Sequence, residues 1–585
     1  MFYPKLRQNT RSRRVNQTFL GYDRSPRPAE GAFVEMENLT GDHFPTLSPR
    51  APRGIVTTLS SPHGLLGKET LVWVDGDSLY INHQPVAGPA LSTLESMCPK
   101  TLISMGAYVL VFPDKLYVNT ANLGDWGYLE NTRSVVCNAD SGVRFSLCRQ
   151  DGTDFGTVWT AADAPEAPEA GAYWLDTALS PPTLKVYSTD SGLWSEVSAV
   201  FVRLEGANLG AGFTQYDGVT LSGCGEKTLN GAAIVQAVGT DYVVISGIIS
   251  TPFTQTAGTV TISRQVPDMD FITQCGNRLW GCKYGLVDGE SVNEIYACAL
   301  GDFKNWNKFQ GLSTDSYVAT RGSDGPWTGA ATHLGCPVFF KENCLEKVYP
   351  ASSGAHEIVS TPCRGVKAGS HNALAIVGEI LYYHSATGVC AYDGALPVCV
   401  SQALGQEQYS EAVAGSAGSK YYISMTDSGG RDHLFVYDTL RQLWYREDGL
   451  RIKAFATVGP TLYGLDQSGR LLAMDGSHGQ REGAVTWYAQ TGPIGIDRAD
   501  PQMISRLCLR LKPEAGSDVD VYIRYDDEGE WLHSANLRGD GLGSRVIPLL
   551  PRRCEFFALR LRGRGPCKIY HISTIWEDGS DTRWP

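Results

Sequence analysis

The sequence of 585 residues has no long apolar run and almost no helical pattern. No segment reaches the roughly 18 apolar residues that a helix needs to cross a bilayer, so we expect no membrane anchor. The basic start, MFYPKLRQNTRSRR, lacks an apolar centre and does not have the pattern of a secretory signal. Because no segment shows sustained helical periodicity, we expect an all-β fold.

Paired cysteine motifs are missing as well. The 15 cysteines include no CxxC pair, and spacings such as Cys275/Cys282 and Cys336/Cys344 match no zinc ribbon or finger. Most cysteines lie inside apolar strands, where a free thiol behaves as a small hydrophobic group. We therefore expect reduced, buried cysteines in a protein that folds in a cytosol.

Catalytic motifs are not found either. The sequence contains no HExxH, GxSxG or GxxxxGK[ST], and no GxGxxG between a strand and a helix. The aspartate pairs Asp75/Asp77 and Asp268/Asp270 lack the ligand spacing of a calcium loop, and the first pair fits a hairpin turn. We predict no catalytic residue, no metal site, no cofactor and no enzyme activity. A hydrolase with two carboxylates from separate strands stays open as an alternative.

Positive charge is the scarcer sign. Lys and Arg number 50 against 62 Asp and Glu, which gives a net charge of −12. This balance argues against tight wrapping of nucleic acid, because phosphate binding needs a basic stripe. An acidic surface would suit a wall past which DNA slides, although ordinary solubility is the simpler explanation of the charge.

A short β motif, in contrast, recurs at least seven times. An apolar run ends in Leu-Tyr or an equivalent, crosses a Gly, Asp or Asn turn, and resumes. The copies are Leu71–Ile81, Tyr108–Val118, Arg278–Ala297, Pro337–Tyr349, Leu374–Tyr392, Lys420–Tyr437 and Thr457–Met474. One hairpin cannot bury its apolar face alone, whereas several arranged around an axis can, so the repeat predicts a β-propeller. The length allows six or seven blades, and the two ends of the repeat could share one blade.

Changes in composition divide the chain into five parts. Residues 1–53 are rich in proline and arginine and read as an extended N-terminal arm, which either lies on a neighbouring subunit or packs locally. Residues 54–130 begin the propeller, and 267–480 complete it. Residues 131–266 have few charges and long alternating runs, as expected for a β-rich domain inserted in a blade connection. Residues 484–585 alternate apolar and polar residues, which predicts a β-sandwich of jelly-roll type.

Two sets of arginines are candidates for contact with an acidic partner. Arg7, Arg11, Arg13 and Arg14 lie in the arm, and Arg560 and Arg562 alternate with apolar residues in the sandwich. The same alternation places Arg506, Arg510 and Arg564 on polar strand faces. Simple solvation of these faces is the alternative explanation.

Aromatic residues offer a second kind of candidate site. Trp306 and Trp327 follow blade strands and could stack on the rings of a glycan, as could Trp280 and Trp444. Tryptophans at repeated blade positions also serve as core residues, and this alternative is open for each of them.

Residues 271–327 carry a recognisable set of motifs. They contain the segments FITQCGNRLWGCKY, VNEIYACALGDFKNWNKFQG, STDSY and DGPWTG. Later segments extend the set, including PVFFKENCLEKVY, YYHSATGVCAYDG, HLFVYDTLRQLWYRED and RRCEFFALRLRG. Together, over roughly 270–580, they resemble structural tail proteins of tailed bacteriophages, above all the nozzle or tail-hub proteins of short-tailed phages. The 172–197 hairpin is similar to small β modules of phage tail and fibre proteins.

This resemblance implies a virion protein of the phage tail, assembled in the cytoplasm of a bacterial host. It implies a β-propeller subunit in a ring homo-oligomer, commonly of six copies, which meets head-to-tail adaptor or portal proteins. The ring would mount tail fibres or spikes and let double-stranded DNA exit without sequence-specific binding. A glycan- or receptor-binding propeller at the tail tip is the alternative function. The 131–266 insertion and the terminal sandwich depart from the family pattern, so the faces that meet the adaptor and the fibres stay open.

Overall fold

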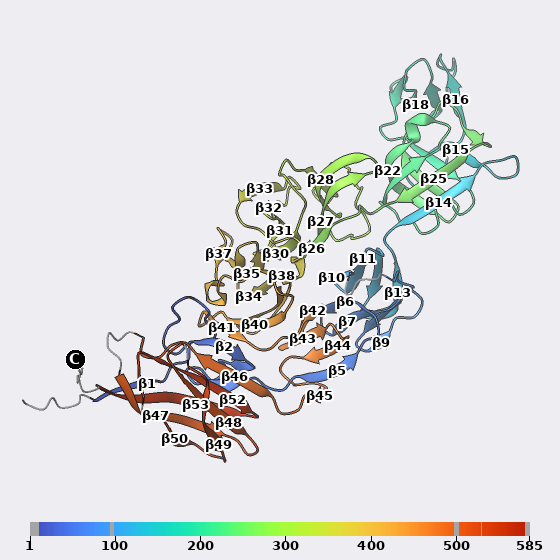
Figure 1. Ribbon diagram of the computed structural model, residues 1–585. Coiled ribbons are helices and arrows are strands. Elements are labelled where there is room, and N and C mark those ends of the chain that lie inside the picture. Colours follow the sequence, from blue (N-terminus) through green and yellow to red (C-terminus); the bar gives the residue numbers. More distant parts are fainter. Residues whose placement is uncertain (1–10, 94–98, 497–501, 528, 551, 579–585) are drawn as a thin grey trace, which may run out of the picture.

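The computed structural model describes residues 11–93, 99–496, 502–527, 529–550 and 552–578 (Figure 1). Within these residues the chain forms 53 strands and three 3-10 helices, which are η1 (Lys227–Leu229), η2 (His371–Ala373) and η3 (Gln402–Leu404). The predicted all-β fold is therefore confirmed. No helix of the described residues is long and apolar enough to cross a membrane.

A jelly-roll sandwich forms one end of the molecule. Its first sheet consists, in spatial order, of β1 (Arg11–Asn16), β53 (Cys567–Asp578), β47 (Gln502–Pro513) and β50 (Gly543–Ile547), with β51 (Arg553–Cys554) on β47. Its second sheet consists of β2 (Phe33–Glu37), β46 (Thr486–Thr491), β52 (Phe557–Arg564), β48 (Asp518–Tyr525) and β49 (Leu532–Arg538). The order β1-β53-β47-β50 opposite β46-β52-β48-β49 is that of two interlocked Greek keys, with β2 added at an edge. Leu507, Val521, Leu561 and Trp576 share one core between the sheets.

The N-terminal segment is part of this sandwich and does not extend away as an arm. Strand β1 pairs with β53 from Arg11 opposite Glu577 to Asn16 opposite Ile572, and β2 pairs with β46. The expectation of an extended arm over 1–53 is therefore wrong for the described residues. Its prolines lie mostly in the connections, which include the small ladder of β3 (Leu39–Thr40) and β4 (Ser48–Pro49).

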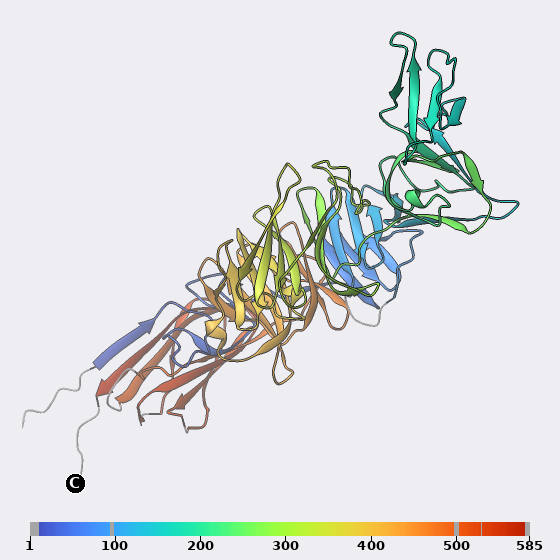
Figure 2. The same cartoon turned by 90° about the horizontal axis from the view of Figure 1, so that it is seen from above.

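Seven sheets of the described chain form the propeller (Figures 1 and 2). Blade 1 has β6 (Pro62–Gly67), β7 (Leu71–Asp75), β8 (Ser78–Ile81) and β9 (Gln84–Pro85). Blade 2 has β10 (Thr101–Met105), β11 (Tyr108–Phe112), β12 (Leu116–Asn119) and β13 (Asn122–Tyr128). Blade 3 has β26 (Phe271–Cys275), β27 (Arg278–Val287), β28 (Glu290–Ala297) and β29 (Tyr317–Thr320). Blade 4 has β30 (Gly329–His333), β31 (Cys336–Lys341), β32 (Cys344–Tyr349) and β33 (Glu357–Pro362).

The remaining blades complete the circle. Blade 5 has β34 (Ala375–Val377), β35 (Ile380–Ser385), β36 (Gly388–Tyr392) and β37 (Val398–Cys399). Blade 6 has β38 (Tyr409–Ala417), β39 (Lys420–Asp427), β40 (Asp432–Asp438) and β41 (Leu443–Arg446). Blade 7 has β42 (Ile452–Val458), β43 (Thr461–Asp466), β44 (Arg470–Ala473), β5 (Gly54–Thr58) and β45 (Gln480–Arg481). The first strands of neighbouring blades contact one another around the axis, except between blades 4 and 5, where η2 contacts β30, β35 and β38. Strand β42 of blade 7 contacts β6 of blade 1 and closes the circle.

Blade 7 closes the propeller with strands from both ends of the repeat. Strand β5 pairs with β44 on one side, with Ile55 opposite Leu472, and with β45 on the other. The backbones approach closely here, since a Cβ added to Gly54 would lie 1.8 Å from the His478 carbonyl oxygen. The propeller therefore enters and leaves through one blade, and the whole of it is inserted between β2 and β46 of the jelly roll.

Residues 131–264 form a second insertion, between blades 2 and 3, and lie at the end opposite the jelly roll in both views (Figures 1 and 2). The main sheet consists, in spatial order, of β14 (Asn131–Val136), β25 (Thr259–Arg264), β21 (Gly218–Ser222), β22 (Gly231–Gly239), β23 (Tyr242–Ser246), β20 (Phe201–Glu205), β15 (Val143–Cys148) and β24 (Phe253–Gln255). It curls around a single core that includes Phe145, Val219 and Ile262. A smaller sheet has β16 (Val158–Ala161), β17 (Tyr173–Asp176), β18 (Thr183–Ser188) and β19 (Leu193–Glu196).

A buried ion network joins the jelly roll to the propeller. Arg53 is 1% exposed, and its two terminal nitrogens lie 2.6 Å from Glu447 Oε2 and 2.7 Å from Asp448 Oδ2. Arg50 donates to Glu482 Oε2 at 2.9 Å, so both chain crossings between the two domains enter the same network. Burial alone would raise the pKa of Asp448, yet Arg53 and Arg50 together hold that pKa below its usual range.

The turn Gly301–Trp306 of blade 3 holds the inserted domain. Asn305 is 1% exposed, and its Nδ2 donates to Asp217 Oδ1 at 3.0 Å while its Oδ1 accepts from the Gly218 amide at 2.8 Å. Asp217 is also paired with buried Arg264. This turn belongs to the segment that carries the resemblance to phage tail proteins, and here its asparagine attaches the insertion to the propeller.

Candidate functional site

The arginines predicted in the sandwich stand on the outer face of the second jelly-roll sheet. In β52 the side chains of Leu559 and Leu561 are buried, so the alternation of a strand turns Arg560, Arg562 and Arg564 outward. This is the face that the sequence pattern predicts.

Aromatic rings from three neighbouring segments lie against these arginines. The Arg562 guanidinium is 5.7 Å from the ring centres of both Tyr488 on β46 and Tyr522 on β48. The Arg560 guanidinium is 4.0 Å from the ring centre of Trp531, which precedes β49. Arg560 also donates to Gln490 Oε1 at 3.0 and 3.3 Å. We call Tyr488, Tyr522, Trp531, Arg524, Arg560 and Arg562 the arginine–aromatic face.

Ring contacts hold the guanidinium planes without using their hydrogen-bond donors. The Arg524 guanidinium lies 5.1 Å from the centre of the Trp531 ring, so this tryptophan contacts two arginines. A cation over a ring contributes about 0.5–1 kcal/mol at an exposed site. Because less side-chain freedom remains to be lost, such arginines are well prepared to bind carboxylates with two parallel hydrogen bonds.

Carboxylates share this face with the arginines: Asp527 lies 3.8 Å from Arg524, and Glu37 and Asp518 line the same groove as Arg562 and Arg564. Asp520 lies opposite Arg562 in register, but it accepts from Asn536 Nδ2 at 2.8 Å and contacts His533 Nε2 at 3.0 Å. The bond from Asn536, which outweighs burial, holds the pKa of Asp520 below its usual value. In the described part of the chain neither Arg562 nor Arg564 forms an ion pair. Both line a shallow groove of about 430 Å³.

Charge is distributed unevenly between the domains. Residues 1–53 and 484–585, which build the jelly roll and the connections to it, contain slightly more Lys and Arg than Asp and Glu. Residues 54–483, the propeller and the inserted domain, contain 27 Lys and Arg against 43 Asp and Glu and so carry the whole negative excess of the chain. The two ends of the molecule in Figure 1 thus differ in charge as well as in fold.

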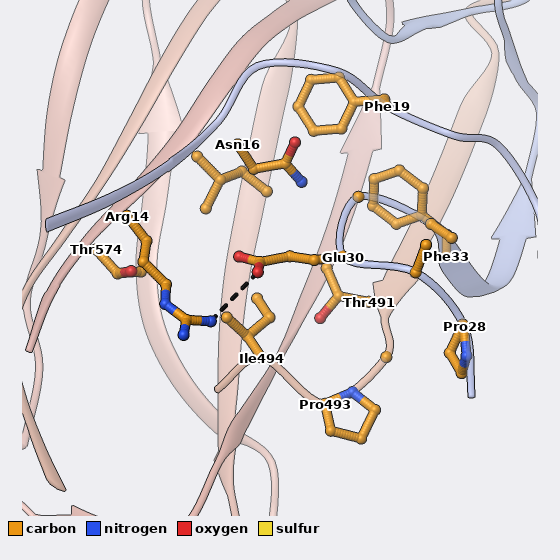
Figure 3. A pocket seen from close by; sticks show the side chains of 15 residues that line it. Arg14, Asn16, Phe19, Pro28, Glu30, Phe33, Thr491, Pro493, Ile494 and Thr574 are labelled. Carbon is orange, nitrogen blue, oxygen red and sulfur yellow. Dashed lines mark hydrogen bonds and ion pairs between the residues drawn. The ribbon is translucent and has the colours of Figure 1, made fainter. Parts of the chain in front are cut away.

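The four N-terminal arginines do not act as one group. Arg7 lies outside the described residues. Arg11 pairs with Glu577 at 2.8 Å, and Arg13 is exposed on the outer face of the first sheet. Arg14 is half-buried and lies on the other side of β1 beside a small cavity, 3.4 Å from Glu30 (Figure 3). Successive side chains of a strand point to opposite faces, so arginines that lie close together in the sequence are separated in the structure.

The two tryptophans expected to stack on glycans are core residues. Trp306 is 5% exposed and donates to the Phe303 carbonyl at 2.9 Å. Trp327 is 4% exposed, and the Lys341 ammonium lies 4.3 Å from its ring centre. Neither ring has a free face, so the prediction that they form a glycan site is wrong. Both fill the space between sheets.

The aspartate pairs have structural partners. Asp75 accepts from the Ser61 amide at 2.6 Å, in agreement with a turn, and Asp270 pairs with Lys283 at 2.8 Å. Asp268 pairs with Lys115 at 2.9 Å. Among the described residues no three His, Cys, Asp or Glu side chains are placed to hold a metal ion. The 14 described cysteines are free thiols, most of them buried.

Comparison with known proteins gives no family. No family model matches the chain, and neither does any curated protein. Among solved structures, the exo-beta-1,3-galactanase of Phanerochaete chrysosporium is 7% identical, with 52% of this chain and 94% of that chain covered and a TM-score of 0.21. PorZ of the Porphyromonas gingivalis type-IX secretion system is 9% identical, covering 86% and 80%, with a TM-score of 0.18. Phage phi92 endosialidase is 9% identical, covering 75% and 56%, with a TM-score of 0.15. At these scores none of the three supports an argument about function.

Proposed function

We propose that this chain is a structural subunit of a phage tail nozzle or hub, which assembles into a ring around the path of exiting DNA. The uneven charge of the molecule carries the proposal. The arginine–aromatic face stands on the end with a small excess of Lys and Arg, and the propeller that follows has more Asp and Glu than Lys and Arg. The acidic propeller of a second copy is therefore a surface of complementary charge to which the arginine–aromatic face of the first copy could bind.

A contact between unlike surfaces of two copies generates a ring when the rotation between them closes. Six copies, which the resemblance to nozzle proteins implies, would give a lumen on the ring axis. Charged groups across such an interface mainly determine which partner binds and how fast it associates. At physiological ionic strength, salt screens the attraction between exposed charges that lie more than about 8 Å apart. The acidic propeller and insertion would line or flank the path of DNA and repel its phosphates.

The distinct ends of the molecule fit a mounting role in the virion. The propeller is attached to the jelly roll by two chain crossings and the Arg53 network, and to the insertion by the Asn305 contacts. A subunit with three attached bodies can contact an adaptor or portal protein at one end and fibres or spikes at the other.

The charge hypothesis is tested by measuring particle mass against salt. We expect mass photometry of the purified protein to show a ring oligomer in 50 mM NaCl and loss of that oligomer in 500 mM NaCl. Arg562→Glu should weaken assembly at least tenfold, since it places a carboxylate between the two tyrosines. Arg552→Glu makes the same charge change in the jelly roll, next to β51 and off the arginine–aromatic face, and should assemble like the unmodified chain.

Two results would contradict this proposal. One is a monomer at every salt and protein concentration, with no ring visible by negative-stain electron microscopy. The other is a ring that Arg562→Glu and Arg552→Glu leave equally intact, because the interface would then lie elsewhere.

A further inference from the structure

We propose that the small sheet β16–β19 is a binding platform for a neutral oligosaccharide. This sheet lies at the tip of the inserted domain, at the end of the molecule farthest from the jelly roll (Figures 1 and 2). The inference does not depend on the ring proposal, because it concerns a different domain and a different chemistry.

The two faces of this sheet have opposite characters. Leu175 on β17 and Leu184 on β18 are fully buried in the core of the inserted domain, so one face of the small sheet packs against the main sheet. Strand alternation turns their neighbours to the other face. Register places Trp159 on β16 opposite Trp174 on β17, and Trp174 opposite Lys185 on β18.

Four aromatic residues share this outer face and are named here the aromatic platform: Trp159, Trp174, Tyr187 and Trp194. Trp159 is 55% exposed, a high value for an indole in the middle of a strand. Tyr187 lies opposite Trp194, and their ring centres are 5.3 Å apart. Trp194 also meets the edge of Trp174 at 5.5 Å.

Trp174 and Lys185 support the platform from within. Trp174 is 7% exposed, and its indole N–H donates to the Ala161 carbonyl at 3.0 Å. The Lys185 ammonium lies 4.8 Å from the Trp174 ring centre and bonds to Asp176 Oδ2 at 2.8 Å. These contacts fix Trp174 between Trp159 on β16 and Trp194 on β19. The backbones of these two strands are three strand spacings, about 14 Å, apart, and the Trp194 ring leans inward to 5.5 Å from Trp174.

The chemistry of the platform selects its occupant. The negative face of an indole ring attracts the weakly positive C–H groups on one side of a sugar ring. Hydroxyl groups of the same sugar can bond to Lys185 and to exposed Glu196, which lies opposite Lys185 on β19. Acidic residues far outnumber the single lysine between 158 and 196, so nucleic acids and acidic polysaccharides are repelled. A neutral chain of several sugars, long enough to reach from Trp159 to Trp194, fits these properties.

Binding is tested with the full-length protein on a printed array of bacterial-type surface oligosaccharides, both neutral and acidic. We expect retention on neutral spots only, and tryptophan fluorescence titration with each bound sugar should show affinity rising with chain length. Trp159→Ala should weaken binding about tenfold and Trp194→Ala should weaken it as well, whereas Trp159→Tyr should restore part of it. Phe309→Ala removes a similarly exposed ring, 50% exposed, from blade 3 and should bind like the unmodified chain.

The inference is overturned if no neutral spot retains the protein, or if the alanine variants at 159 and 194 bind as well as the unmodified chain. Preference for acidic spots or for DNA would also overturn it, since the platform would then act through a cation. Unchanged circular dichroism and melting temperature of Trp159→Ala, expected for a side chain on the surface, show that lost binding does not come from unfolding.

Discussion

The buried side chain of Arg53 links the jelly roll to the propeller through two ion pairs. It lies where the chain passes from the jelly roll into blade 7, and it meets Glu447 from blade 6 and Asp448 just beyond it. An isolated cation in such a place would cost several kcal/mol to bury, and these two carboxylates offset that cost. The sequence shows only an arginine after a proline-rich stretch, because its partners lie almost 400 positions away.

Arg53→Ala is predicted to lower the free energy of unfolding by about 3 kcal/mol, because the buried Glu447 and Asp448 then keep, among the described residues, only Arg50, 3.9 and 3.4 Å away, as a counter-ion. Urea unfolding followed by tryptophan fluorescence measures the loss. Arg11→Ala, which removes a partner of Glu577 with a side chain 75% exposed, should cost less than about 1 kcal/mol. Equal losses for the two variants would show that the network contributes nothing beyond a surface ion pair.

The candidate site at residue scale could be predicted only in part. The alternation of Arg560 and Arg562 with leucines is visible in the sequence and places them on one face. Tyr488 on β46 and Trp531 just before β49, which hold these arginines, come from other segments of the chain, and nothing local in the sequence connects them. Trp306 and Trp327 misled the prediction for a related reason: a tryptophan beside a blade strand looks the same whether it faces solvent or the next sheet.

The elements follow the sequence pattern more closely. Each of the seven recurring hairpins lies in a separate blade, because local alternation and turn residues determine a hairpin. The sharing of blade 7 between β5 and β42–β44, which the sequence left open, is also observed. Strands β1 and β2 were not foreseen as part of the sandwich, since their partners β53 and β46 lie more than 400 residues away. The parallel pairing of β16 with β17 has no local signal either.

Gly54→Ala tests the closure of blade 7. The added Cβ would lie 1.8 Å from the His478 carbonyl, and backbone must move to admit it, so we expect a loss of about 1–3 kcal/mol. Thermal unfolding measures the change. Gly483→Ala, where no atom lies within 4 Å, is the matched control and should be neutral. A neutral Gly54→Ala would mean that β5 is not held tightly between β44 and β45.

At the scale of the whole molecule, one domain is threaded through another. The jelly roll is made from two ends of the chain, and the propeller is the connection between its strands β2 and β46. The propeller itself contains the second insertion between blades 2 and 3. The sequence predicts a separate arm for residues 1–53, whereas β1 and β2 belong to the jelly roll. The limits of the propeller and of the insertion do follow the changes in composition.

Removal of residues 1–38 is predicted to expose the edges of β53 and β46 and to cause aggregation of the shortened protein, because unpaired strand edges recruit other strands. The aggregated fraction is measured by light scattering during refolding and by the share of soluble protein after expression. A peptide of residues 11–49 supplied in trans should restore part of the soluble fraction by adding its strands to the open edges. A shortened protein that stays soluble and folded without the peptide would contradict this account.

Because the propeller lies between β2 and β46 in the sequence, the jelly roll cannot be completed until late in synthesis. About 450 residues separate β2 from β46, so at the usual pace of a ribosome roughly 20 to 90 s pass before the earliest strands of the jelly roll meet their partners. The arginine–aromatic face needs β46, β48 and β52, and hence cannot form before β52 has been synthesised. Until then a growing chain lacks the surface that, in the ring proposed above, would contact a second copy, and so it would be protected from premature association.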